Sequence, residues 1–334
     1  MSLWREPAGA WPNSLALAYA FLGHAAGLAL LLQGSWLALA AGVLLTAHSM
    51  IIAAYLVHEC AHSTLFAARR VNSAVGEALL WVTGAAYASF DRVQHMHLRH
   101  HQDRADVALF DYRSFLRRMP PWAARTVEAL EWAHVPAVEL LMHAQVMLRP
   151  FLDDGQRRYR DRVVRVLLTR IALFALLASI SPWALVGFAL AYLLFLKGLF
   201  LGDAFAHTYP EFFVTDPNQP VPRDGRDRAY DTGHTFSNLL SPRHSRLNLW
   251  NLNFGYHTAH HERASIPWYR LPAAHAERYG ADHPQVLPFA ELTHTIHRHR
   301  VRRVLGEDYG AVGEGADRAK GFAGVLGVSF LSIV

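Results

Sequence analysis

The chain has 334 residues, of which 52% are hydrophobic and 18% charged, and its formal net charge is +5. A single cysteine, Cys60, excludes a disulfide framework and a cysteine-held electron-transfer centre within this sequence. The basic balance does not indicate nucleic-acid binding, because the arginines adjoin long uncharged runs instead of forming a basic face of their own. The distribution of charge indicates an integral membrane protein.

The first long uncharged run extends from Pro7 to Val57 and contains no Lys, Arg, Asp or Glu. It is long enough for two membrane spans of about 20 residues each, with a break at Gln33–Ser35. We therefore predict transmembrane helices at approximately 14–32 and 36–57. A moderately apolar segment follows at Asn72–Phe90 and predicts a short re-entrant or interfacial helix.

The second uncharged run covers Ile171–Leu196. With its flanks it accommodates two more spans, which we predict at approximately 162–180 and 183–205, with a break at Ser181-Pro182. Long basic side chains near span ends can snorkel to the membrane interface. We assign this behaviour to Arg165, Arg170 and Lys197.

The arginines are distributed unevenly between the connecting segments. Asp91–Arg170 holds fourteen arginines, whereas both turns within the predicted pairs of spans hold none. By the positive-inside rule, residues 58–161 and 206–334 are expected in the cytoplasm. The predicted fold is a single all-α integral-membrane domain over residues 1–334. It has four transmembrane helices as two hairpins, a re-entrant helix and a cytoplasmic cap rich in histidine.

Three histidine motifs adjoin these spans on the predicted cytoplasmic side. Each uses helical spacings of three or four residues, which place imidazoles on one helix face. The first motif is H-x-x-x-H, the second and third are H-x-x-H-H, and one further histidine ends the fourth span. The nine residues are His58, His62, His97, His100, His101, His207, His257, His260 and His261. Nine imidazoles exceed the needs of one tetrahedral zinc ion and suit two metal ions, although spacing does not choose among iron, copper, nickel and zinc.

Other histidines are less clearly assigned. His95 lies two residues before the second motif, and His234 lies between His207 and the third motif. The roles of both stay open. We interpret the remaining isolated histidines as ordinary core or surface residues.

The first motif also reads H-E-x-x-H, which is the zinc-protease signature, through Glu59. An intramembrane zinc protease would leave seven of the nine histidines without a role, so we keep it as a remote alternative. A carboxylate-bridged di-iron bundle would need Glu-x-x-His twice and two further glutamates. Glu131 and Glu291 supply that short motif, but their Arg-containing surroundings indicate solvated helix faces. A metal-binding or transport protein would place its ligands at mid-span.

The stretches HECAHSTLF, HMHLRHH, DAFAHTY and NFGYHTAHHERASIPWYRLP, within residues 15–275, resemble the integral-membrane fatty acid desaturase and hydroxylase superfamily. The resemblance implies two non-haem irons held by the nine histidines listed above, with no catalytic residue beyond the metal centre. It implies O₂ as co-substrate and electrons from a separate ferredoxin, rubredoxin or cytochrome b5 type protein. The expected substrate is a lipid acyl chain.

The expected reaction is desaturation of a fatty acyl chain. Hydroxylation or ketolation of a fatty acyl, alkane or carotenoid substrate is the alternative. Because imidazoles bind metal in their neutral form, carboxylates at Glu59, Asp203 and Asp231 are candidates to orient them.

Overall fold

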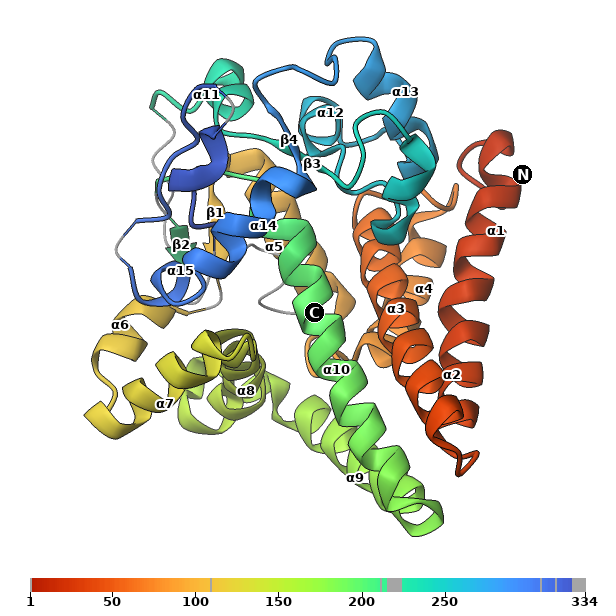
Figure 1. The fold of residues 1–334 in the computed structure, drawn as a ribbon. Coiled ribbons are helices and arrows are strands. Elements are labelled where there is room, and N and C mark those ends of the chain that lie inside the picture. Colours follow the sequence, from red (N-terminus) through yellow and green to blue (C-terminus); the bar gives the residue numbers. More distant parts are fainter. Residues whose placement is uncertain are drawn as a thin grey trace. The chain divides into compact units, whose positions relative to one another are not determined.

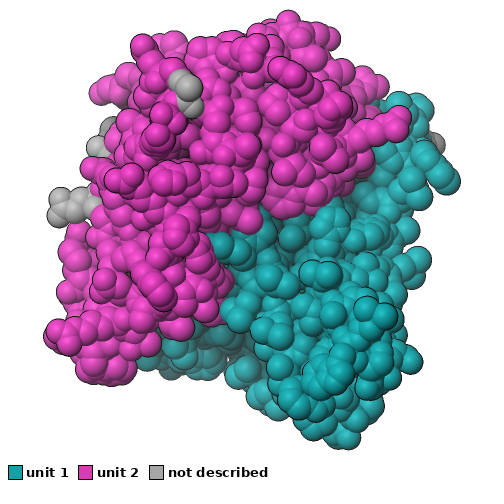
Figure 2. Space-filling model, viewed as in Figure 1, with its two compact units in different colours: residues 1–94, 141–199, 333–334 teal, residues 95–140, 200–332 magenta. Residues whose placement is uncertain are grey.

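The computed structural model describes residues 2–108, 110–210, 212–214, 224–306, 308–315 and 317–325. The chain divides into two compact units (Figure 2). Unit 1 comprises residues 1–94, 141–199 and 333–334, and unit 2 comprises residues 95–140 and 200–332. Three helices contribute residues to both units: α5 (Phe90–Asp103), α8 (Ala137–Leu152) and α10 (Pro182–Asp203).

The first apolar run of unit 1 is helical almost throughout. Its elements are η1 (Pro7–Gly9), α1 (Ala10–Ala18), the π-helical turn η2 (Tyr19–Gly23), α2 (His24–Leu31) and α3 (Trp36–Ala61). The turn before α3 uses Gly34 at a φ of 72°, a conformation that glycine adopts without a steric penalty. Ser35 then caps α3, because its hydroxyl accepts a hydrogen bond from the backbone N–H of Ala38 at 3.2 Å.

Helices α2 and α3 lie side by side (Figure 1) and approach closely at two glycines. A Cβ atom at Gly27 would lie 2.4 Å from the Thr46 hydroxyl oxygen, and one at Gly42 would lie 2.9 Å from the backbone nitrogen of Leu31. Small residues allow such close packing between apolar helices, where dispersion forces stabilise the contact.

The second apolar run forms α9 (Arg160–Ile180), which follows the 3₁₀ turn η3 (Asp154–Tyr159), and α10. Proline at the first position of α10 is compatible with a helix start, because that position needs no donor. Within unit 1, Phe174 and Leu177 of α9 pack against a cluster that contains Ala184 and Phe188 of α10.

Four helices in the described part of the chain are long and apolar enough to cross a membrane. They cover Pro7–Leu31, Trp36–Ala61, Asp154–Ile180 and Pro182–Asp203. The predicted number of spans and the mostly helical fold class are therefore confirmed. The helix boundaries differ from those predicted, and α3 continues past Val57, so that His58 lies within the helix.

The prediction that Arg170 snorkels from a span end is wrong. Arg170 lies ten residues from either end of α9, and only 9% of it is exposed. Its side chain turns into unit 1, where it donates a hydrogen bond to the carbonyl oxygen of Trp81. Arg165 on the same helix is exposed, as expected.

The segment predicted as a short helix forms α4 (Arg69–Thr83). Its 15 residues fall short of the roughly 20 that a span requires. The helix ends at Gly84, which takes a φ of 89°. Nearby, Arg162 forms an ion pair with Glu77 and donates to the carbonyl oxygen of Ala88.

Unit 2 consists of short helices and two pairs of short parallel strands. Strand β1 (Asp106–Ala108) pairs with β2 (Phe212–Val214), and β3 (Ser237–Leu239) pairs with β4 (Val286–Pro288). Its helices are α6 (Tyr112–Arg117), α7 (Pro121–Trp132), α11 (Arg228–Gly233), α12 (His257–Glu262), α13 (Leu271–Ala276), α14 (Phe289–Arg298) and α15 (Arg302–Leu305). The 3₁₀ turns are η4 (Ser245–Asn251), η5 (Trp268–Arg270) and η6 (Arg318–Gly321). The predicted cytoplasmic segment 206–334 ends outside the described residues.

Unit 2 also contains a buried ion-pair cluster. Arg303 of α15 lies 3.0 Å from a carboxylate oxygen of Glu139 and 3.2 Å from one of Glu131. All three residues are at most 3% exposed. Glu131 was predicted to mark a solvated helix face, and this prediction is wrong, because its carboxylate pairs with a cation from a distant helix.

We expect Arg303→Met to destabilise the protein by about 3–5 kcal/mol, because it leaves two buried carboxylates without a cation. Arg302→Met is the matched control, since Arg302 pairs with Asp308 at the exposed surface and its loss should cost about 1 kcal/mol or less. Thermal unfolding of the purified full-length protein measures both effects. Equal melting temperatures for the two variants would contradict a stabilising role for the buried cluster.

Candidate metal centre

Four imidazoles of unit 2 form the first histidine cluster, which consists of His100, His207, His257 and His261. One ring nitrogen from each lies within 4.8 Å of those of the others. The Nε2 atom of His207 is 3.1 Å from that of His100 and 2.8 Å from that of His257. The four side chains therefore direct nitrogen atoms toward one point.

Different elements bring these residues together. His100 lies on α5, and His207 follows α10 in an isolated β-bridge with Thr235. His257 and His261 are four residues apart on α12, so they share one helix face. The start of α12 is held by β3, because the Ser237 hydroxyl lies 2.7 Å from that of Thr258 and accepts a hydrogen bond from the Thr258 backbone N–H.

The outer ring nitrogens of His100, His207 and His261 have protein partners that fix the orientation of these rings. The Nδ1–H of His100 donates to the Ala105 carbonyl oxygen at 2.9 Å, so its Nε2 lone pair faces the cluster. Nδ1 of His261 lies 3.2 Å from a carboxylate oxygen of Asp231, and Nδ1 of His207 lies 3.3 Å from the Thr235 hydroxyl. Metal-binding histidines typically have such outer partners.

Burial favours the neutral, metal-binding state of His207. It lowers the pKa of His207 well below its usual value, and His261, His100 and His257 lower it further. Burial alone would raise the pKa of Asp231, but the interaction with His261 and the hydrogen bond from Tyr209 outweigh burial and lower that pKa. At neutral pH the cluster thus combines a neutral imidazole with an ionised carboxylate behind it.

Tyr209 adds a partner that sequence analysis did not identify. Its hydroxyl donates to the Asp231 carboxylate, and its ring stacks on His207 with 4.5 Å between centroids. Burial and the Asp231 carboxylate raise the pKa of Tyr209 well above its usual value, so the hydroxyl keeps its proton. Its position two residues after His207 is the only sequence signal that could have indicated it.

Three further imidazoles of unit 2 form the second histidine cluster, which consists of His97, His101 and His260. Nε2 of His101 lies 3.2 Å from that of His97 and 3.1 Å from that of His260. His97 and His101 lie one helical turn apart on α5, and His260 lies on α12. Helices α5 and α12 thus contribute to both clusters, because neighbouring histidines on each helix belong to different clusters.

The first histidine motif belongs to unit 1. His58 lies on the last turn of α3, and His62 follows the helix end with 4.8 Å between the two ring centroids. Glu59 lies close to His58, with 3.4 Å between Oε1 and Nδ1, and its other oxygen accepts a hydrogen bond from the Thr64 hydroxyl at 2.6 Å. Within unit 1, the Glu59 carboxylate thus lies beside the outer nitrogen of the His58 imidazole.

Two further carboxylates of unit 2 are buried, and one of them lies close to His100. Asp106 is fully buried, and its Oδ1 is 3.9 Å from Nδ1 of His100. Burial raises the pKa of Asp106 to about 8, and Arg113 offsets this only in part. Asp203 is 1% exposed, and neither of its oxygens has a hydrogen-bond partner among the described residues. Asp203 was a sequence candidate, whereas Asp106 was not.

Neither of the two less certain histidines belongs to a cluster in the described part of the chain. His95 of α5 is exposed. His234 donates from Nδ1 to the Tyr230 carbonyl oxygen at 2.8 Å, and its ring stacks near Tyr209.

The spacing of the nitrogens fits shared metal ions. Ligands at about 2.0–2.1 Å from one ion lie about 2.9–3.4 Å apart, and the Nε2–Nε2 separations are 2.8–3.2 Å. Lone pairs facing one another at this distance repel unless a cation lies between them. Imidazole is a common ligand of iron, and the donor set therefore fits metal binding.

A family model described as Fatty acid desaturase matches residues 34–293 of the chain. The match includes all nine candidate ligands and both histidine clusters. No individual curated protein matches the sequence.

We expect Asp231→Asn to weaken metal retention by about 10- to 100-fold, because the amide no longer supplies the negative charge that holds His261. Asp282→Asn is the matched control, since Asp282 is exposed and lies outside both clusters. Iron per chain is measured by mass spectrometry after dialysis against increasing concentrations of chelator. Identical retention curves for both variants would contradict the orienting role of Asp231.

Proposed function

Because the chain belongs to the fatty acid desaturase family, we propose that it is an O₂-dependent, di-iron membrane oxidoreductase that introduces a C=C bond into a fatty acyl chain. The observation that carries this proposal is the first histidine cluster, with its ring nitrogens directed inward and the outer nitrogens of His100, His207 and His261 held by protein partners. Such an arrangement favours a bound metal ion over an empty polar core.

We assign one iron to the first histidine cluster. The other is assigned to the second histidine cluster together with His58 and His62. The spacing of the three motifs supports this division, because i and i+4 positions on each helix can serve a common ion. Glu59 then acts on His58 as Asp231 acts on His261, which makes the H-E-x-x-H match a coincidence of spacing.

When bound, two irons would supply the oxidising power, drawn from O₂ and two electrons, that removal of hydrogen from an unactivated C–H bond requires. Burial keeps the His207 imidazole neutral. Asp231, Thr235 and the Ala105 carbonyl hold the ring planes of His261, His207 and His100. Tyr209 keeps its proton and so stabilises the Asp231 carboxylate. The expected electron donor is a separate ferredoxin, rubredoxin or cytochrome b5 type protein.

The proposed arrangement in the membrane is one domain with four spans and all histidine motifs on the cytoplasmic side. The four apolar helices and the arginine-rich connection between the second and third of them support it.

We expect His260→Ala to abolish product formation and to reduce iron from about two per chain to about one. His244→Ala should change neither, because His244 is exposed and outside the clusters. Deuterated fatty acids fed to expressing cells, followed by mass spectrometry of the lipids, measure the product. An alkene lacks two hydrogens, whereas an alcohol gains one oxygen and would favour the hydroxylase alternative. Full activity of His260→Ala would contradict the assigned site.

Topology has its own test. Cysteine at Gln33 should react with a membrane-impermeant maleimide in intact cells, and cysteine at Arg118 should react only after lysis. The native Cys60 is buried and gives little background. Labelling of Arg118→Cys in intact cells would place the second histidine motif outside the cytoplasm and contradict the proposed arrangement.

A further inference from the structure

Arg170 is a buried cation at the middle of α9, where the uncharged run Ile171–Leu196 begins. It stands about 15 Å along the axis from either end of α9, at a rise of about 1.5 Å per residue. Cations within membrane spans are costly and normally face a partner or a cavity. Arg170 is nine-tenths buried, so bulk water does not solvate its charge.

The described protein groups only partly satisfy this side chain. One terminal nitrogen donates to the Trp81 carbonyl oxygen, and the guanidinium carbon lies 5.7 Å from the Trp81 ring centroid. Its Nε has no hydrogen-bond partner, and among the described residues no carboxylate forms an ion pair with it. A buried cation without an anion is a strongly unfavourable arrangement.

A cavity of about 300 Å³ lies beside Arg170 within unit 1. Its apolar wall includes Phe174, Phe188 and Ala189, and the hydroxyl-bearing rings of Tyr87 and Tyr192 also line it. Arg170 is the one charged residue that lines it. The cavity thus combines a single positive group with an apolar interior, which is the usual composition of a site for an amphiphilic ligand.

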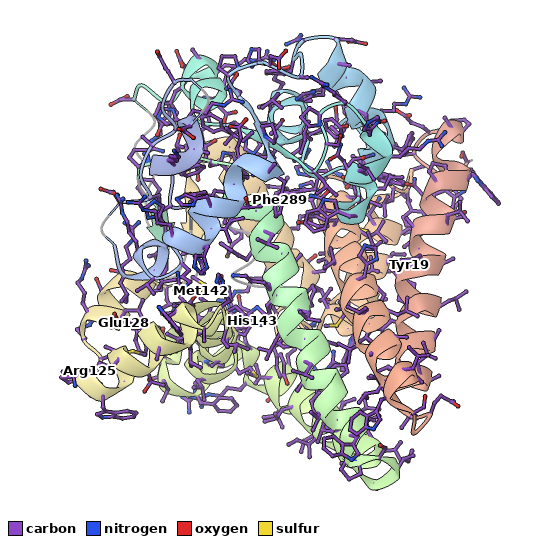
Figure 3. All side chains as sticks on the ribbon, in the orientation of Figure 1. Tyr19, Arg125, Glu128, Met142, His143 and Phe289 are labelled. Atoms are coloured by element: carbon purple, nitrogen blue, oxygen red, sulfur yellow. The ribbon has the colours of Figure 1, made fainter. Side chains whose placement is uncertain are left out.

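Tyr192 is held in place from the far side. Its hydroxyl lies 2.6 Å from Nδ1 of His143 on α8, the residue labelled in Figure 3. A Cβ atom at Gly84 would lie 3.1 Å from the Tyr192 ring. Glycine at this position therefore avoids a close contact with the ring. The polar end of the cavity is therefore built from ordered groups.

We propose that this cavity binds a small amphiphile whose anionic oxygen head pairs with Arg170 and whose hydrocarbon chain lies along Phe174 and Phe188. A volume of about 300 Å³ lies at the small end of ligand pockets, which span about 300–1,000 Å³, and suits a single short chain. A planar guanidinium pairs with an oxyanion through two parallel hydrogen bonds, and the single charge of a carboxylate balances the single cation. The proposed ligand class is therefore a medium-chain monocarboxylic acid. All lining residues belong to unit 1, and the site does not depend on metal or on the proposed reaction.

Binding of radiolabelled octanoate to the full-length protein in amphipol tests the site. We expect saturable binding of octanoate, at least tenfold weaker binding of octanol and methyl octanoate, and at least tenfold loss in Arg170→Gln. Arg165→Gln, on the exposed side of the same helix, should bind octanoate within twofold of the unchanged protein. Equal binding of octanol, or full binding by Arg170→Gln, would overturn the proposal. Tighter binding of octyl phosphate than of octanoate would overturn the choice of a carboxylate.

A second variant keeps the test decisive if Arg170→Gln does not fold. Ala189→Leu adds bulk to the cavity wall while the cation remains, and it should weaken octanoate and octanol together by at least tenfold. Unchanged octanoate binding in this variant would show that the ligand lies elsewhere.

Discussion

The inward orientation of imidazole nitrogens is the constraint on which the organisation of unit 2 depends. Ring nitrogens that converge within a few ångströms repel one another when all are neutral and unprotonated, and protonation of buried rings is also costly. The protein resolves this conflict outside the rings. Each outer nitrogen with a defined partner fixes one tautomer, and burial keeps the His207 ring uncharged.

This requirement explains features of the surrounding fold that are otherwise unusual. Helix α12 has only six residues, too short to be stable alone, yet it carries ligands for both clusters. It is held at its start by hydroxyl contacts to β3, a strand of three residues. Short elements joined by side-chain hydrogen bonds place ligands from separate parts of the sequence at one point. The buried cluster around Arg303 stabilises the same unit away from the metal ligands.

The sequence predicted those features that depend on local composition. The four long apolar helices followed from the absence of charge, and the ligand candidates followed from repeated spacing of histidines. What it could not predict depends on partners distant in the chain. The sequence suggests that the charged side chains of Arg170 and Glu131 face solvent or the membrane interface. In the structure both are buried: Arg170 donates to the Trp81 carbonyl oxygen, and Glu131 pairs with Arg303. Asp106 lies in no motif, and Tyr209 ends the stretch DAFAHTY without a role that its position predicts. Only tertiary structure places both beside the ligands. The predicted span ended at Val57, where the uncharged run ends, whereas α3 continues through His58 and Glu59, which are both buried.

The close contact between α2 and α3 has a consequence for the histidine pair at the far end of α3. Gly42 fixes the axial register of the two helices, and His58 lies sixteen residues further along α3, about 24 Å away. A slip of one residue would raise or lower that imidazole by about 1.5 Å and turn it by about 100°. Gly27 and Gly42, which have no reactive side chain, thus determine the axial position and the direction of the distant His58 side chain. The register can shift only by less than the size of the methyl group that each glycine lacks.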